Sequence, residues 1–60
     1  MNAYYESLLD RIREEMQLSR WKAAMQLIQG ELDLPYVPQD AMDQLEELKQ
    51  ECRGAMSTPR

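Results

Sequence analysis

Hydrophobic residues recur at helical spacing in the first part of the chain. Apolar side chains at positions 5, 8, 9, 12 and 16 follow the spacing that lines one face of a helix. They are Tyr5, Leu8, Leu9, Ile12 and Met16. The positions between them are mostly charged, and no proline or glycine interrupts them. The pattern predicts an amphipathic helix over about residues 3–17.

A second stripe follows after a short connection. Its members are Trp21, Ala24, Met25, Ile28 and Leu32, which predict a helix over about residues 20–32. Ser19 stands just before this stripe, and its hydroxyl can accept a backbone N–H of the first turn, so we expect it to be the N-cap. Because so few residues connect the two stripes, the helices should form a tight antiparallel hairpin.

Gly30 allows two interpretations of where the second helix ends. It can cap the helix, which would then end near Gln29. It can instead lie inside the helix at a loss of about 1 kcal/mol, allowing another backbone to approach closely. We favour the interior position, because Leu32 continues the stripe.

A third stripe is narrower. Ala41, Leu45, Leu48, Cys52 and Ala55 are separated by 4, 3, 4 and 3 residues, a heptad-like seam. Pro38 is tolerated in a first helical turn and Asp40 is a favourable cap, so we expect this helix to begin at residues 38–41. The stripe predicts a helix over about residues 39–56, followed by a frayed tail at 57–60.

The connection between the second and third stripes is stiff and apolar. Pro35 and Pro38 disfavour helical backbone at the residues that precede them, so residues 33–38 should be extended. We expect this strut to cross the end of the hairpin. Leu34, Tyr36 and Val37 would then fill the end of a small core.

The hairpin resembles a known repeat family. The run Trp21-Lys22-Ala23-Ala24, followed by Ile28 and Pro35, resembles the second half of a tetratricopeptide repeat, and the resemblance covers residues 5–35. The sequence departs from that pattern at Glu31, where the family has a small residue, and Pro35 comes one position early. The resemblance implies a helix pair, an interaction role and self-association, and it implies no chemistry.

Together these patterns predict an all-α fold with three helices in an antiparallel arrangement, forming one domain over residues 1–56. The side chains expected in its core lie on the three stripes and in the strut. They are Tyr5, Leu8, Leu9, Ile12, Met16, Ala24, Ile28, Leu32, Tyr36, Leu45, Leu48 and Cys52.

Composition narrows the possible functions. The formal net charge of −4 and the isoelectric point near 4.6 argue against binding nucleic acid, which requires clustered Lys and Arg. No apolar run approaches the ~20 residues of a membrane span. One cysteine and the lack of a signal-like start fit a reducing cytoplasm.

The sequence contains few side chains of the types that carry out catalysis. The chain has no histidine, so a Ser-His or Cys-His nucleophile cannot be assembled, and we expect neither enzymatic activity nor a cofactor. No calcium-loop spacing is present, so no metal site is expected. Cys52 lies on the apolar seam, which favours a small buried hydrophobe over a redox thiol.

Several side chains are candidates for a partner interface. Three short helices offer too little interior to bury every Met and aromatic side chain, so we expect Tyr4, Trp21, Met25, Met42 and Met56 to contribute to a contact surface. Asp43 and Glu47 on the third helix can dock a basic partner, or can simply face solvent. The formal PxxP at residues 35–38 lacks the basic flank of a typical ligand of that kind, which favours a structural role.

These observations lead to three hypotheses. The first is a non-catalytic interaction module whose first partner is itself, as a homodimer or a larger assembly. The second is a small acidic regulator that masks a basic surface on another protein. The third is a piece of a longer protein with its active site elsewhere.

Overall fold

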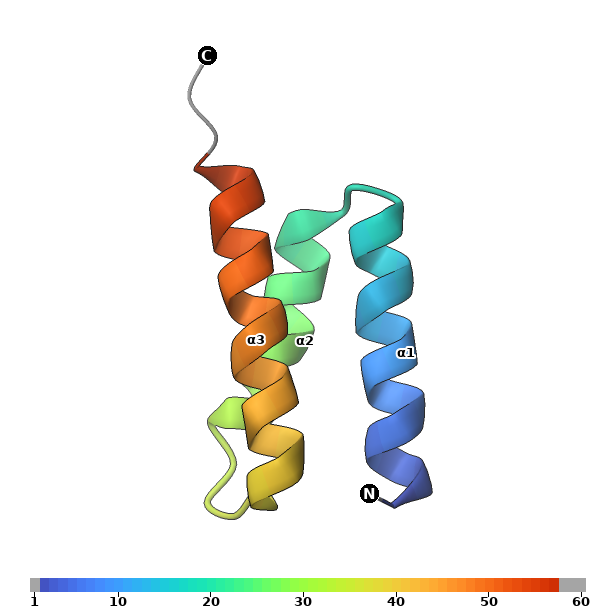
Figure 1. The fold of residues 1–60 in the computed structure, drawn as a ribbon, viewed down its shortest axis with the longest axis vertical. Helices are drawn as coiled ribbons and strands as arrows, with labels where there is room; N and C mark the ends of the chain where they lie inside the picture. Colours follow the sequence, from blue (N-terminus) through green and yellow to red (C-terminus); the bar gives the residue numbers. More distant parts are fainter. Residues whose placement is uncertain (1, 58–60) are drawn as a thin grey trace.

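The computed structural model describes residues 2–57, which form three helices (Figure 1). They are α1 (Ala3–Gln17), α2 (Trp21–Leu32) and α3 (Gln39–Met56). Residues 2–57 contain no strand. The all-α three-helix fold predicted from the stripes is therefore confirmed, with α2 beginning one residue later than expected. Of the tail expected to fray, residues 58–60 lie outside the described part of the chain.

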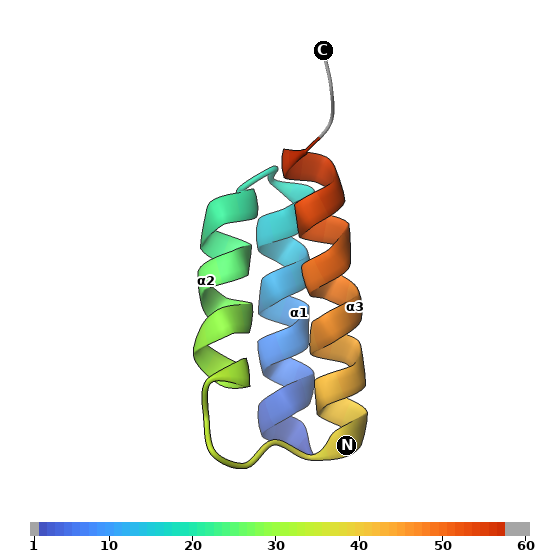
Figure 2. The same cartoon turned by 90° about the vertical axis from the view of Figure 1, so that its left-hand side faces the viewer.

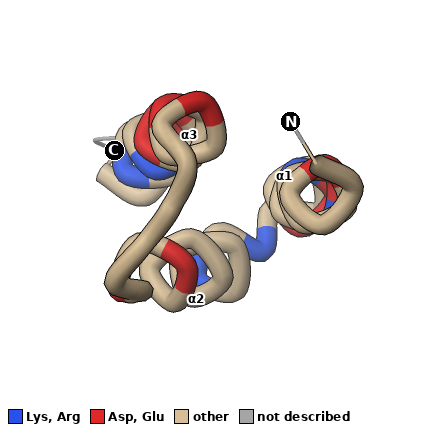
Figure 3. The backbone as a smooth tube through the Cα atoms, turned by 90° about the horizontal axis from the view of Figure 1, so that it is seen from below, with Lys and Arg blue, Asp and Glu red and all other residues tan. Residues whose placement is uncertain are grey.

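The helices form an antiparallel bundle. The chain ascends through α1, descends through α2 and ascends again through α3, so that α1 and α3 run in the same direction (Figures 1 and 2). Seen along their axes, the three helices stand at the corners of a triangle (Figure 3). Helix α2 packs more extensively on each neighbour than α1 and α3 pack on each other. The side of the bundle between α1 and α3 is consequently its most open side.

The turn between α1 and α2 closes by a motif that the sequence analysis missed. Ser19 has a positive φ of 61°, in the left-handed region that glycine usually occupies. Its N–H donates to the Met16 carbonyl at 2.9 Å, and the Arg20 N–H donates to the Glu15 carbonyl at 2.8 Å. These are the two hydrogen bonds of a Schellman motif. Ser19 therefore terminates α1, and its predicted role as the N-cap of α2 is wrong, because Arg20 takes that position.

Two substitutions should stabilise the protein: glycine at the left-handed position 19 and alanine at the helical position 30. Gly30 lies inside α2, is exposed, and has no atom within 4 Å of an added Cβ, so the expected close backbone approach is absent. We expect Ser19→Gly and Gly30→Ala each to raise the free energy of unfolding by about 1 kcal/mol, measured by urea denaturation. A loss of stability in Ser19→Gly would contradict the left-handed turn.

The helix starts also differ from expectation. The Asn2 side chain caps α1 by accepting the Tyr5 N–H at 3.0 Å, a role the sequence analysis did not assign. Helix α3 begins after Pro38, whose carbonyl accepts the Met42 N–H at 2.9 Å. Asp40, expected as the cap, lies within the first turn, where its carboxylate accepts the Ala41 N–H.

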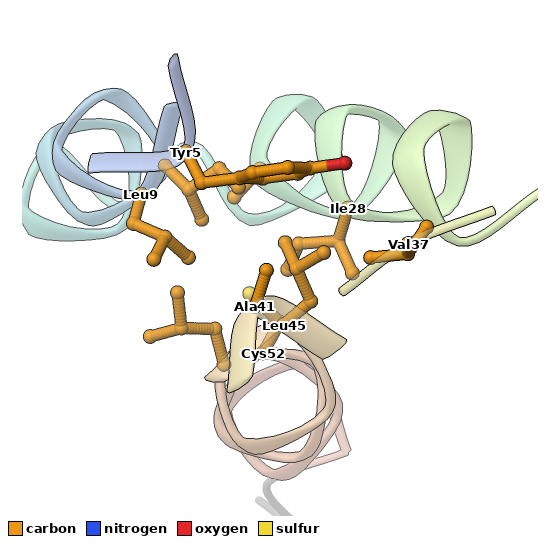
Figure 4. Packing of buried hydrophobic residues seen from close by; sticks show 10 residues of the cluster. Tyr5, Leu9, Ile28, Val37, Ala41, Leu45 and Cys52 are labelled. Atoms are coloured by element: carbon orange, nitrogen blue, oxygen red, sulfur yellow. The ribbon is translucent and has the colours of Figure 1, made fainter. Parts of the chain in front are cut away.

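The core is a single apolar cluster between the three helices (Figure 4). Its buried members are Tyr5, Leu9, Ile12, Ala24, Ile28, Val37, Ala41, Leu45, Leu48 and Cys52. Leu8, Met16 and Leu32, also expected in the core, are partly buried and pack against this cluster. In the seam of α3, Ala41, Leu45 and Cys52 have no exposed surface, Leu48 is buried, and Ala55 is partly buried.

The proline strut fills the core with one side chain where three were expected. Val37 is buried, whereas Leu34 is 47% exposed and Tyr36 is 78% exposed. Placing Tyr36 in the core was therefore wrong. Asp33 still has helical backbone, so the extended strut predicted over residues 33–38 starts later than expected, whereas Pro38 is extended. Where the backbone is extended, neighbouring side chains point in opposite directions, which accounts for the different exposure of Tyr36 and Val37. Val37 is the one that packs against the hairpin, and Tyr36 is left in solvent.

Candidate interaction surface

The described residues offer few groups for catalysis or metal binding. Residues 2–57 contain no cluster of three Cys, Asp or Glu side chains that could hold a metal ion. Cys52 is fully buried, and burial raises the pKa of its thiol, with a smaller contribution from the charge of Glu51. Within the same range, no helix combines the length and the apolar character that crossing a membrane requires.

The residues expected at a partner interface are spread over the bundle. Tyr4 is 58% exposed in the first turn of α1, and Met56 is 49% exposed at the end of α3. Trp21, Met25 and Met42 are partly buried and pack against the core. Asp43 and Glu47 are exposed on α3. The set is therefore divided between all three helices and between both ends of the bundle.

Two hollows that share Arg13 lie along the open side of the bundle, between α1 and α3, and we call them together the groove. Its apolar floor consists of Leu9 in one hollow and of Met16, Leu48 and the α2 residue Trp21 in the other. The Arg13 guanidinium crosses the groove between these two parts, donating to the Gln44 amide oxygen at 3.0 Å. Arg13 also lies 3.8 Å from the Asp10 carboxylate.

The rim of this groove is acidic. Its lining contains four carboxylates and only one guanidinium, that of Arg13. The four belong to Glu6, Asp10, Glu47 and Glu51. Since Arg13 is already engaged by Asp10, the lining holds three further carboxylates and no further Lys or Arg. Such a surface favours a cationic partner.

A buried carboxylate lies at the lower end of the bundle, where α2 meets the strut. Glu31 is only 9% exposed, and its Oε2 accepts a 2.7 Å hydrogen bond from the Tyr4 hydroxyl. Its Oε1 is buried and has no hydrogen-bond partner among residues 2–57. The sequence held a signal for this position, because Glu31 follows Ala24 and Ile28 at the spacing of the buried face. A buried acceptor without a donor is unfavourable for the isolated fold.

Tyr4 should ionise late because of this contact. The pKa of Tyr4 is raised above 10.0. The hydrogen bond to Glu31 is the largest cause, and burial and the negative charge of Glu31 act in the same direction. Because the folded pKa is raised, the contact stabilises the fold below pH 10.0, and this contribution is lost as pH rises through the folded pKa. The measurement is a pH titration of the tyrosinate absorbance of wild type and of Tyr4→Phe. The difference between the two curves should show one group that titrates above pH 10.0.

Glu31→Gln is the matched control for that titration. It removes the charge but keeps the size of the side chain, so the Tyr4 pKa should fall toward 10.0. Circular dichroism recorded at each pH confines the comparison to folded protein. A Tyr4 that titrates at or below 10.0 in wild type would contradict the contact.

The large apolar side chains that remain exposed stand at the two ends of the bundle. Leu34 and Tyr36 of the strut and Tyr4 of the first turn of α1 lie at the lower end in Figure 1, which we call the proline end. Leu18, in the turn after α1, is 55% exposed and, with Met56, lies at the opposite end, which we call the turn end. The exposure of Leu18, Leu34 and Tyr36 was not anticipated from the sequence.

Comparison with known proteins identifies the family of this chain. No curated protein and no solved structure matches it. The model of the family described as "Protein of unknown function (DUF3196)" matches residues 1–58, which includes all three helices. This match gives no support to the tetratricopeptide-like assignment of residues 5–35. The chain belongs to the DUF3196 family.

Proposed function

We propose that this protein is a non-catalytic interaction module that associates with copies of itself. The observation that carries the proposal is the exposure of Tyr4, Leu34 and Tyr36 at the proline end and of Leu18 and Met56 at the turn end. Covering apolar surface is worth about 25 cal/mol per Å². A chain of 60 residues is only marginally stable alone, so a contact that covers these side chains adds substantially to its stability.

The small number of reactive side chains supports a function that is carried out by contact with another protein. The chain has no histidine, and its one thiol is enclosed in the core. The lone cysteine fits a reducing compartment, so we place this function in the cytoplasm. The tetratricopeptide resemblance of residues 5–35 points to the same class of function, because such repeats act by contacting other protein segments.

The proposal is tested by the dependence of thermal stability on protein concentration. Association of the folded state raises the melting temperature as concentration rises. We expect this dependence in wild type and its loss in Leu34→Ser/Tyr36→Ser. Gln50→Ser, at an exposed polar position on α3, is the control and should behave like wild type. A melting temperature that stays constant over a hundredfold range of wild-type concentration would contradict self-association.

The groove between α1 and α3 favours a second candidate function, that of an acidic regulator. Its apolar floor and acidic rim suit an amphipathic helix of another protein, with an apolar stripe flanked by Lys or Arg.

A synthetic helix of Leu and Lys residues at that spacing is a suitable probe. Glu47→Gln/Glu51→Gln should weaken its binding about tenfold, because two rim charges are lost. Glu14→Gln/Glu46→Gln, which removes two exposed charges that do not line the groove, is the control. Equal losses in both variants would exclude the groove as the binding site.

A further inference from the structure

We propose that copies of this protein associate head to tail, with the proline end of one copy against the turn end of the next. This inference rests on the proposed self-association and specifies its geometry. It follows from how the fold distributes charge along the bundle and from the apolar side chains at both ends.

Folding separates the charges of the chain into two halves of the bundle. The half near the proline end consists of residues 2–10 and 27–47, which contain eight Asp and Glu and no Lys or Arg. The half near the turn end consists of residues 11–26 and 48–57, which contain six Lys and Arg and three Asp and Glu. Figure 3 views the proline end and shows acidic positions on the near turns of α2 and α3. The bundle is therefore negative at one end and positive at the other.

The two ends also match in their apolar character. At the proline end, Tyr36 and Leu34 project from a strut whose backbone two prolines restrain. At the turn end, Leu18 and Met56 are exposed, and each is followed or preceded within three residues by an exposed arginine, Arg20 or Arg53. Arg20 also lies 3.7 Å from the Glu15 carboxylate. A contact between unlike ends therefore covers apolar side chains on both partners and brings opposite charges together.

The charge distribution disfavours the symmetric alternative. A two-fold contact between proline ends would oppose two acidic surfaces, since neither contains a Lys or Arg. The head-to-tail contact is heterologous, so any open assembly keeps one free proline end and one free turn end, and it grows with concentration. Its area is small, because three helix ends cover on the order of 300 Å². A typical stable interface buries about 800 Å² per partner, so the contact should be weak and sensitive to salt.

The test uses two variants that each remove the apolar side chains of one end. Leu34→Ser/Tyr36→Ser alters the proline end, and Leu18→Ser/Met56→Ser alters the turn end. These side chains are exposed, so both variants should fold, as circular dichroism will check. We expect each variant alone to sediment as a monomer at concentrations where wild type associates. An equimolar mixture should form a dimer and nothing larger, because it retains one intact end of each kind.

Other outcomes would overturn the geometry and leave self-association standing. If the turn-end variant still dimerises by itself, like ends meet and the contact is symmetric. If each variant alone associates as wild type does, the contact lies elsewhere on the bundle. A mixture that stays monomeric while wild type associates would contradict the head-to-tail geometry. Wild-type association should also fall by at least about threefold between 0.05 and 0.5 M NaCl, and an increase with salt would contradict the charge match. A wild-type protein that remains monomeric would overturn the proposed function itself.

Discussion

Replacing Leu45 with alanine should remove a large share of the protein's stability at room temperature. Leu45 has no exposed surface and lies within the cluster between α1, α2 and α3. Removing a buried leucine side chain lowers the free energy of unfolding by about 2–5 kcal/mol, from lost apolar burial and the cavity left behind. A domain of this length has only roughly 3–9 kcal/mol available. Urea denaturation followed by circular dichroism measures the loss directly.

Tyr36→Ala is the matched control for Leu45→Ala. Tyr36 carries the larger side chain but is 78% exposed, so its truncation should change the free energy of unfolding by less than about 0.5 kcal/mol. The comparison should be made at low protein concentration, where association contributes least. A loss of several kcal/mol in Tyr36→Ala, or less than about 1 kcal/mol in Leu45→Ala, would contradict the core shown in Figure 4.

The thiol of Cys52 should react with a disulfide reagent at least about 100-fold more slowly in the folded protein than in the urea-unfolded chain. Two effects act in the same direction. The side chain has no exposed surface, so the reagent reaches it only after opening of the bundle. Burial also raises the pKa of the thiol, which lowers the fraction of reactive thiolate near pH 8.

The labelling rate should follow global stability. Gly30→Ala should slow it and Leu45→Ala should speed it toward the unfolded rate, since both act on the opening equilibrium. Equal rates for folded and unfolded wild type would mean that α3 does not pack its seam against the hairpin. In that case Cys52 would be an accessible thiol, and the account of the core would be wrong.

The helices could be predicted because each one carries a regular apolar stripe. The spacing of Tyr5, Leu9 and Ile12 lines one side of a helix whatever the helix packs against. Periodicity over 12 or more residues averages out local exceptions, and this is why even Gly30 did not obscure α2. The burial of Cys52 followed from the same argument, because it continues the seam of α3.

The connections could not be predicted in the same way, because their conformation depends on tertiary packing. Ser19 is a favourable N-cap by type, yet the short turn requires a left-handed residue at this position to close α1. In the strut, the prolines indicate extended backbone but do not say which of Tyr36 and Val37 faces the core. Asn2 was overlooked because the first stripe begins only at Tyr5.

The candidate surface was still harder to predict, because it exists only after folding. Residues 2–10 and 27–47 lie far apart in the sequence, and neither segment alone reveals that one end of the bundle lacks cations. The individual interface candidates were chosen by residue type. Trp21 and Met25 turned out to pack against the core, whereas Leu18 and Leu34 remain exposed without being among those candidates.

Sedimentation equilibrium of the wild-type protein tests self-association most directly. The monomer mass is 7.1 kDa. We predict an average mass that rises above this value as protein concentration increases through the micromolar range, and that falls again in Leu34→Ser/Tyr36→Ser. A folded species of 7.1 kDa at every concentration up to high micromolar would contradict the proposal that this bundle associates with itself.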